Sequence, residues 1–346
     1  MTTEWLKKIQ IVFCYAHKDE KLLKELKAHL VVLQRLKMTS VWHDRDITAG
    51  MEWERETNAY LNTADIILLL ISPDFLASEY CYSVEMGQAM ERHEREGIYV
   101  IPILLRPVDY EGTPISQLDI LPADRKPITW FNRDRVFSDI AKHIRKVVES
   151  LLFRKLIDEG DTQFAVSRYS EALKAYEQAL QLNASDASTL SKKGGTLVEL
   201  KQYSEALVAY EQALQFDSNS AVLQSKRGAI LFSLKQYDEA VTAYKQAIQL
   251  DPRDAILYKK KGDILCSLRR YEEALEAYEQ ATQLESSDAD ACYAKANTFL
   301  ELKRYDEALA AYEQTLQLDP TKADYYKGKG NVLLKLVTIV AREEPF

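Results

Sequence analysis

The sequence predicts an α/β domain followed by an all-α solenoid, joined in one chain of 346 residues. All tryptophans, histidines and methionines lie within residues 1–150, whereas the remainder is dominated by Ala, Leu, Tyr, Glu, Gln and Lys. After residue 150, tyrosine and alanine positions also recur every 34 residues. A chain of this length exceeds the ~150 residues expected for one domain. We therefore expect two domains, at 1–150 and 151–346.

The first domain alternates strand and helix patterns. Apolar segments predict five strands, at 9–15, 40–43, 65–72, 99–105 and 127–131. Helical patterns lie between and after them, at about 19–37, 52–63, 76–95 and 134–152. Short apolar strands in such alternation form a parallel sheet with helices on both faces. The first domain is therefore predicted to be a five-stranded parallel sheet.

Ligands of a parallel α/β sheet bind beyond the carboxyl ends of its strands, where the strand order reverses. In this sequence that edge should carry Tyr15, Ala16 and His17 after the first strand. It should also carry the loop 44–51 and the segment that follows Ser72. A site is therefore expected among these three segments.

The second domain contains an internal repeat. Aromatic residues recur at Tyr169, Tyr203, Tyr237, Tyr271 and Tyr305, and again at Tyr176, Tyr210, Tyr244, Tyr278 and Tyr312. Small residues recur at Gly160, Gly194, Gly228, Gly262, Ala296 and Gly330. Each unit fits two amphipathic helices that cross closely at the small residue, with aromatic rings filling the gap to the next unit. We expect five repeats and a terminal helix, at 153–186, 187–220, 221–254, 255–288, 289–322 and 323–340. This pattern resembles the tetratricopeptide repeat (TPR), whose solenoids bind proteins or peptides on their concave face.

Charge and composition exclude several classes. The formal net charge is -8 and no polybasic run occurs, so nucleic acid and membranes are not expected partners. The longest apolar run, Ile66–Ile71, is shorter than the ~20 residues of a membrane-spanning helix. Neither a dinucleotide-binding nor a P-loop glycine pattern is found, and no histidine or cysteine spacing indicates a metal site. Four widely spaced cysteines indicate a reducing compartment, so we expect a cytoplasmic protein.

Four segments suggest a family for the first domain. They are VFCYAHKDE at 12–20, WHDRDITAGMEW at 42–53, SPDFLASEYCYSVEMGQAMERHE at 72–94 and IPILLRPVDY at 101–110. In this order and spacing they resemble the Toll/interleukin-1 receptor (TIR) domain, in the form common among bacterial fusions. The resemblance covers about residues 8–150 and implies a flavodoxin-like fold. With the repeats added, the whole chain resembles a bacterial TIR–TPR fusion.

The resemblance implies an enzyme. Catalytic TIR domains cleave the nicotinamide–ribose bond of NAD+, and their essential glutamate matches Glu85 in SEYCYSVE at 78–85. NAD+ would then be the substrate, with no cofactor and no metal. The chemistry agrees, because a carboxylate stabilises the oxocarbenium-like ribose left by nicotinamide. Tyr80 lies five residues before Glu85, where the family often has an aromatic residue four before. We therefore expect the local helix start to be shifted by one residue.

Further positions follow from the same resemblance. The implied substrate-binding residues are Tyr15, Ala16, His17, Asp46, Trp53, Cys81 and Tyr82. Ala16 departs from the basic or hydroxyl residue of many relatives, and Trp53 fits either stacking on the substrate or packing in the core. The loop that resembles the family's assembly loop carries Asp44, Arg45, Asp46 and Gly50, which fit a contact with a neighbouring TIR domain or a solvated turn. On a regular α-helix, Tyr82 and Ala89 would share the face of Glu85. Glu79 would point away as a solvated acid.

Two functions are open at this stage. In the first, the chain is an NAD+ glycohydrolase or cyclase in bacterial immune-type signalling against viruses. It would be regulated by TIR assembly into homo-oligomers and by a protein or peptide bound to the TPR groove. In the second, it is a non-catalytic adaptor that joins TIR–TIR contacts to proteins held by the repeats. Glu85 in its motif favours the enzyme. The product stays open, because water and adenine compete for the same ribose cation.

Two patterns in the second half bear on partners and on the domain junction. A basic residue recurs at one repeat position, as Lys193, Arg227, Lys261, Lys295 and Lys329, and fits either a solvated edge or a track for an acidic partner. Lys327 and Asn331 have carboxylate-clamp spacing only in the terminal helix, so recognition of peptide C-termini is not predicted. Between Asp134 and Glu159 there is no Gly or Pro, so the last helix of the first domain should continue into, or dock on, the first repeat.

Overall fold

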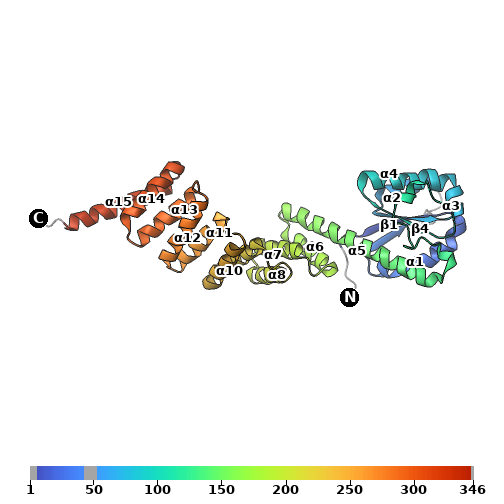
Figure 1. Ribbon diagram of the computed structural model, residues 1–346, viewed down its shortest axis with the longest axis horizontal. Helices are drawn as coiled ribbons and strands as arrows, with labels where there is room; N and C mark the ends of the chain where they lie inside the picture. The colour runs from blue at the N-terminus through green and yellow to red at the C-terminus, as the bar shows by residue number, and fades with distance from the viewer. Residues whose placement is uncertain (1–5, 43–52, 344–346) are drawn as a thin grey trace. The chain divides into compact units, whose positions relative to one another are not determined.

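The computed structural model describes the backbone of residues 6–42 and 53–343, and the side chains within 6–40 and 58–339 (Figure 1). It divides into two compact units, residues 1–162 with 181–183 and residues 163–180 with 184–346. Helix α5 (Arg133–Ala165) is one continuous helix of 33 residues. The domain boundary expected at residue 150 therefore lies inside a helix, as the absence of Gly and Pro in this stretch allows.

The first unit is built on a parallel sheet with the strand order β2-β1-β3-β4. Its strands are β1 (Ile9–Cys14), β2 (Thr39–Trp42), β3 (Ile66–Ile71) and β4 (Tyr99–Leu104). In register, Ile11 of β1 lies beside Val41 on one side and Ile66 on the other. All six residues of β3 are buried. Because this strand has no solvent-facing side, its sequence is continuously apolar and does not alternate.

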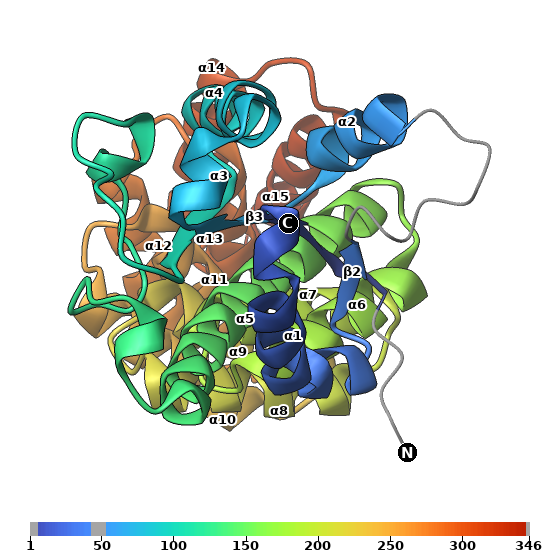
Figure 2. The same cartoon turned by 90° about the vertical axis from the view of Figure 1, so that its right-hand side faces the viewer.

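Helices cover both faces of the sheet. Helices α2 (Trp53–Thr63), α3 (Pro73–Ala77) and α4 (Gly87–Glu96) lie over one face, and α1 (Glu20–Arg35) and α5 over the other (Figures 1 and 2). On the first face, Val12 and Cys14 of β1 belong to one apolar cluster with Phe75 and Ala89. On the second, α5 buries residues at helical spacing, namely Phe137, Ile140, Ile144 and Val148. The α/β prediction is confirmed.

The fifth strand, predicted at 127–131, is wrong. That segment contains a single 3-10 turn, η5 (Ile128–Trp130). The outer edge of β4 is paired instead by Leu121, whose N–H and carbonyl make two 2.8 Å hydrogen bonds to it. Pro127 has no N–H to donate, and Ile128 is fully buried at the start of the turn. The segment therefore packs against the sheet without forming a ladder, and the described sheet has four strands.

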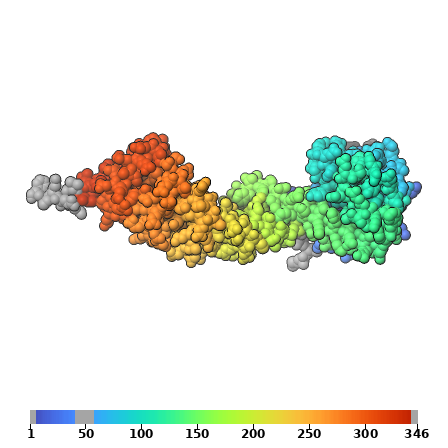
Figure 3. All heavy atoms as spheres, viewed as in Figure 1, coloured from blue at the N-terminus to red at the C-terminus, as the bar shows by residue number. Residues whose placement is uncertain are grey.

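The second unit is a stack of helix pairs. Its helices are α6 (Tyr169–Leu182), α7 (Ala187–Glu199), α8 (Tyr203–Phe216), α9 (Ala221–Ser233), α10 (Tyr237–Leu250), α11 (Ala255–Ser267), α12 (Tyr271–Leu284), α13 (Ala289–Glu301), α14 (Tyr305–Leu318) and α15 (Ala323–Glu343). From α7 onward, two helices fall within each expected repeat and α15 follows as the terminal helix. In Figure 3 the colour changes steadily along this unit from yellow-green to red, as expected when each repeat packs on its neighbours in order.

The recurring glycines permit the close crossing within each pair. A Cβ atom at Gly194, Gly228 or Gly262 would lie 2.9, 2.7 or 2.6 Å from a tyrosine ring of the following helix. Contacts that short do not occur for real Cβ atoms, so only glycine fits without a shift of the ring. The predicted close crossing at the small residue is confirmed. The rings pack first on their own repeat, which the 34-residue period alone did not indicate.

Candidate active site

The candidate site lies at the carboxyl ends of β1 and β3. The chain leaves β1 for β2 on one side and reaches β3 on the other, so the strand order reverses between these neighbours. A cavity of about 290 Å³ opens there, lined by Phe13, Tyr15, Ala16, His17, Lys18, Asp74, Ser78, Tyr80, Cys81 and Glu85. The structure thus brings together the segment after β1 and the segment after β3, as expected. The loop 44–51 lies outside the described residues.

Glu85 reaches this cavity from a π-helix, η3 (Tyr80–Met86). A π-helix bonds residue i to residue i+5, so residues five apart lie on one face. Tyr80 and Glu85 are five apart, and both line the cavity. The predicted one-residue shift is therefore accommodated as a wider helical turn and not as a later start. Such turns are found mostly at functional sites. Glu85 is only 6% exposed, so its carboxylate is largely withdrawn from bulk water.

The wider turn changes which neighbours accompany Glu85. Tyr82 and Ala89 are not among the residues that line the cavity, and both pack in or against the apolar cluster beside the sheet. The α-helical spacing that placed them on the face of Glu85 does not hold through a π-helix. Glu79 is exposed and accepts a 3.0 Å hydrogen bond from Ser83 Oγ. It therefore points away from the cavity, as expected of a solvated acid.

The residues that follow β1 form the opposing part of the lining. Cys81 Sγ donates a weak 3.8 Å hydrogen bond to the Tyr15 carbonyl, which links η3 to this segment. The Tyr15 and His17 rings lie 6.3 Å apart in an edge-to-face arrangement. The pKa of the Cys14 thiol is raised well above its usual value, by burial first and then by Glu85 and Cys81. Cys14 is therefore a neutral thiol, and Glu85 lies close enough to act on it electrostatically.

A charged network ties the strand-end segments together. Asp19, only 1% exposed, accepts hydrogen bonds from Ser72 Oγ at 2.5 Å and from Arg106 Nε at 2.8 Å. Arg106 also bonds Asp74, whose second partner is Lys18 at 2.6 Å. Hydrogen bonds from Lys18 and Arg106 lower the pKa of Asp74. Sequence reasoning missed this network, although each residue lies in one of the four TIR-like segments. Only the fold brings together charges from segments so far apart in the chain.

Comparison with known families decides the identity of both units. Residues 11–144 match the TIR domain family. Residues 194–234 and 228–264, and residues 259–323 and 293–338, match two tetratricopeptide-repeat families. The chain is a TIR–TPR fusion. This is the architecture of a TIR-type signalling or adaptor protein, and some members of the TIR family are NADases.

Individual relatives cover parts of the TIR–TPR chain. The uncharacterized protein y4lF of Sinorhizobium fredii (strain NBRC 101917 / NGR234) is 45% identical over 137 residues, which are 39% of this chain and 42% of that protein. The match thus spans less than half of that relative's length. Among solved structures, YrrB, "a TPR protein with an unusual peptide-binding site", is 24% identical with a TM-score of 0.48, over 55% of this chain and 96% of that one. A crystal structure of MamA is also 24% identical, with a TM-score of 0.46, over 48% and 97%.

Other TIR residues expected at the site lie outside the described part of the chain. Asp44, Arg45, Asp46 and Gly50 belong to the stretch 43–52, whose backbone is not described. Trp53 is the first residue of α2, but its side chain is outside the described set. The assembly contact and the stacking of Trp53 on the substrate therefore stay predictions.

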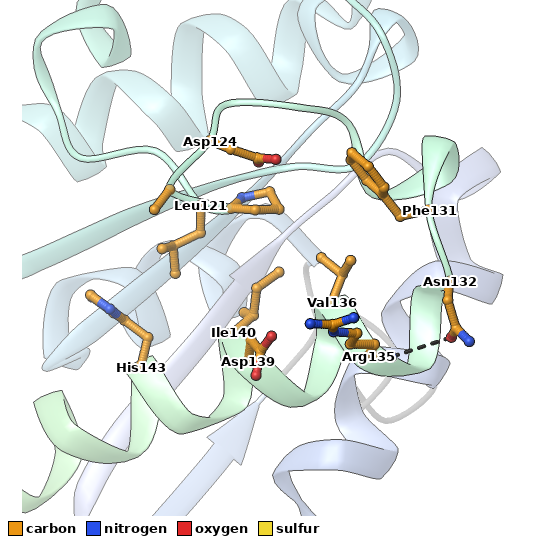
Figure 4. Close-up of a pocket in the computed structure, with 11 residues that line it drawn as sticks. Leu121, Asp124, Phe131, Asn132, Arg135, Val136, Asp139, Ile140 and His143 are labelled. Carbon is orange, nitrogen blue, oxygen red and sulfur yellow. Dashed lines mark hydrogen bonds between the residues drawn. The ribbon is translucent and has the colours of Figure 1, made fainter.

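A second, larger cavity of about 580 Å³ lies elsewhere in the TIR domain (Figure 4). Its lining comes from the segment after β4 and from the first turns of α5. Figure 4 shows Asp124 and Phe131 on one side, with Val136 and Ile140 of α5 facing them. Leu121, which occupies the place of the missing fifth strand, also contributes. None of the TIR-like segments reaches this cavity, so we assign the site chemistry to the smaller one.

Two further findings concern ions and lipid. Among the described residues, no group of three or more His, Cys, Asp or Glu side chains is arranged to hold a metal ion. No helix in the described ranges is both long and apolar enough to cross a lipid bilayer.

Proposed function

We propose that the TIR domain cleaves the bond between nicotinamide and ribose in NAD+, and that Glu85 is the catalytic residue. The observation that supports this most directly is the position of Glu85, a 6% exposed carboxylate in a cavity at the strand ends of the sheet. Tyr80 and Tyr15 line the same cavity and offer aromatic surface for the nicotinamide ring. Tyr15, Ala16, His17 and Cys81 would complete the substrate-binding residues.

The proposed step needs a negative charge and little else from the protein. When the C1′–N bond breaks, its electron pair leaves with nicotinamide, which departs neutral, and the ribose keeps the positive charge. A carboxylate held beside that carbon stabilises the cation strongly, because little water screens it in a cavity. Water then attacks C1′, giving ADP-ribose and one proton, or an adenine nitrogen attacks and gives a cyclic product. Both routes use Glu85 in the same way.

The size of the cavity suits one end of the substrate. Small-molecule pockets usually measure about 300–1,000 Å³, so 290 Å³ is at the low end of that range. This volume fits the nicotinamide–ribose end, while the remainder of the dinucleotide would extend outside. Lys18 lines the cavity with a side chain that is 78% exposed. It would offer a positive charge to the phosphates as they leave the cavity.

The activity would belong to a regulated cytoplasmic signalling protein of the bacterial antiviral type. Homo-oligomeric contacts between TIR domains would complete or align the sites. A protein or peptide on the TPR repeats would control that assembly. The alternative is a non-catalytic adaptor, in which the same two kinds of contact recruit proteins and NAD+ is not consumed.

Turnover of NAD+ by the purified full chain, with chromatographic identification of products, tests the proposal. Glu85→Gln keeps the side-chain shape and removes its charge. Loss of one preorganised electrostatic contact typically lowers kcat by about 100–1,000-fold, so we expect at least ~100-fold lower turnover at an unchanged melting temperature. Glu79→Gln is the matched control from the same segment and should retain activity, because Glu79 is exposed. A folded Glu85→Gln variant with near-native turnover would remove Glu85 from the mechanism. No turnover by the native chain at any concentration would favour the adaptor.

A further inference from the structure

The basic residues that recur along the TPR repeats are mostly neutralised within the stack. Each lies 16 residues after a glutamate on the second helix of the preceding repeat. The ion pairs are Lys193–Glu177 at 2.9 Å, Arg227–Glu211 at 3.3 Å, Lys295–Glu279 at 3.5 Å and Lys329–Glu313 at 2.9 Å. The continuous track for an acidic partner that the sequence left open is therefore not present at these four positions. Each pair instead links one repeat to the next.

The fifth position breaks this pattern. Where the other repeats place a glutamate, α10 carries Lys245, so Lys261 of α11 meets a second positive charge (Figure 1). Within the described residues, neither lysine has an ion-pair partner. Burial, and then the charge of Lys245, lower the pKa of Lys261. Two copies of the same charge therefore face a junction that carries an attractive pair in every other repeat.

The acids around this junction do not fully compensate the two lysines. Arg270, Glu273 and Glu276 also act on Lys261. Glu273 is already bonded to Arg270 by two hydrogen bonds of 2.6 and 2.7 Å. Glu276 is then the remaining acid against two lysines. One positive charge is left over at a repeat junction that is otherwise neutral.

A cavity lies beside Lys261 and can admit a small side chain. It measures about 300 Å³ and is lined by Tyr258, Lys261, Glu276, Ala277, Glu279 and Gln280, from α11 and α12. Glu279 is occupied by its ion pair with Lys295. Tyr258 and Gln280 supply hydrogen-bonding groups. The space is thus large enough and polar enough to receive one charged group from another molecule.

We propose that Lys245 and Lys261 bind a side-chain carboxylate of an acidic peptide segment in a partner protein. The carboxylate would take the place that a glutamate of the chain itself holds at the other four positions. A monoanionic carboxylate suits the site better than a phosphate, because Glu276 opposes a double negative charge. Two lysines also act as point charges and lack the bidentate geometry with which arginine binds phosphate. Binding of the peptide would complete the link between the repeats that contain α10 and α11.

Fluorescence anisotropy with the full chain tests the proposal. The probe is a short labelled glycine-rich peptide that carries several glutamates, and its control is the same peptide with glutamines. At low ionic strength the native chain should bind the glutamate peptide alone, and added salt should weaken that binding. Lys245→Glu restores the pair seen in the other repeats, so it should fold normally, as circular dichroism can verify. It should weaken peptide binding by about tenfold or more, since it replaces an attraction with a repulsion.

The matched variant makes the reverse change one repeat earlier. Glu211→Lys places a lysine against Arg227 and should create a second site of the same kind, so two peptides should bind per chain. Unchanged affinity in Lys245→Glu would overturn the proposal. So would equal binding of both peptides by the native chain, no binding at all, or a single site in Glu211→Lys. None of these measurements involves NAD+, and they stand apart from the fate of the proposed activity.

Discussion

Replacing Asp19 with asparagine should destabilise the TIR domain and leave the repeats unaffected. The two Asp19 oxygens accept hydrogen bonds from Ser72 Oγ at 2.5 Å and Arg106 Nε at 2.8 Å. Asparagine keeps the shape, but its NH2 group turns a donor toward a donor, and its neutral side chain no longer compensates Arg106. Breaking a buried ion pair costs about 3–5 kcal/mol, and losing a hydrogen bond to a charged group about 1.5–3 kcal/mol. Because Arg106 is 31% exposed and keeps its bond to Asp74, we expect about 2–3 kcal/mol.

The tryptophans make this effect measurable in the full chain. All four lie within the first 150 residues, so their fluorescence during urea unfolding reports on the TIR domain and not on the repeats. With an m value of about 2 kcal/mol/M, the expected loss lowers the midpoint by roughly 1–1.5 M urea. Circular dichroism of the same samples follows the many helices of the repeats, whose transition should not move.

A second aspartate provides the control. Asp139→Asn removes an exposed carboxylate of α5 that pairs with Lys142 at 2.8 Å. Exposed pairs contribute little to stability, so the midpoint of this variant should match that of the native chain. Equal midpoints for Asp19→Asn and Asp139→Asn would refute the view that the buried network holds the strand-end segments together.

Three further predictions concern the repeats and assembly. Gly262→Ala should destabilise the repeats by about 1–3 kcal/mol, because its Cβ would meet a tyrosine ring at 2.6 Å, whereas Gly330→Ala, with nothing within 4 Å, should stabilise them by about 0.5–1 kcal/mol. Thermal melts measure both, and equal effects would contradict the packing argument. Burial raises the pKa of Asp263 above 3.8, so the folded state holds its proton more tightly and stability falls as pH rises through that window. Asp263→Asn should remove this loss and raise the melting temperature near pH 7 but not near pH 3, since Asn297 accepts the equivalent tyrosine hydrogen bond in the next repeat; a gain independent of pH would count against this cause. Finally, specific NAD+ turnover should rise with protein concentration by mass action, and Asp46→Lys should lower assembly and turnover together; constant specific activity over about a hundredfold dilution excludes the assembly mechanism.

The repeats and the position of the candidate site could be predicted from the sequence. Each TPR helix pair repeats the same contacts every 34 residues, so a glycine such as Gly262 carries its packing role in its register. The apolar run of β3 identifies a strand buried on both faces for an equally local reason. From the strand assignments, the rule for parallel sheets places Tyr15 and the residues after Ser72 at one edge.

Tertiary contacts decided the remaining features. Leu121 competes for the edge of β4, and the outcome depends on hydrogen bonds that no local pattern of 127–131 reveals. The π-helical turn aligns Tyr80 with Glu85, whereas spacing alone favoured Tyr82. Asp19 meets Arg106 only because both follow parallel strands of one sheet, although they lie 87 residues apart in the chain. In all three cases the partner is distant in sequence, and the energy of that contact outweighs the local preference of the segment.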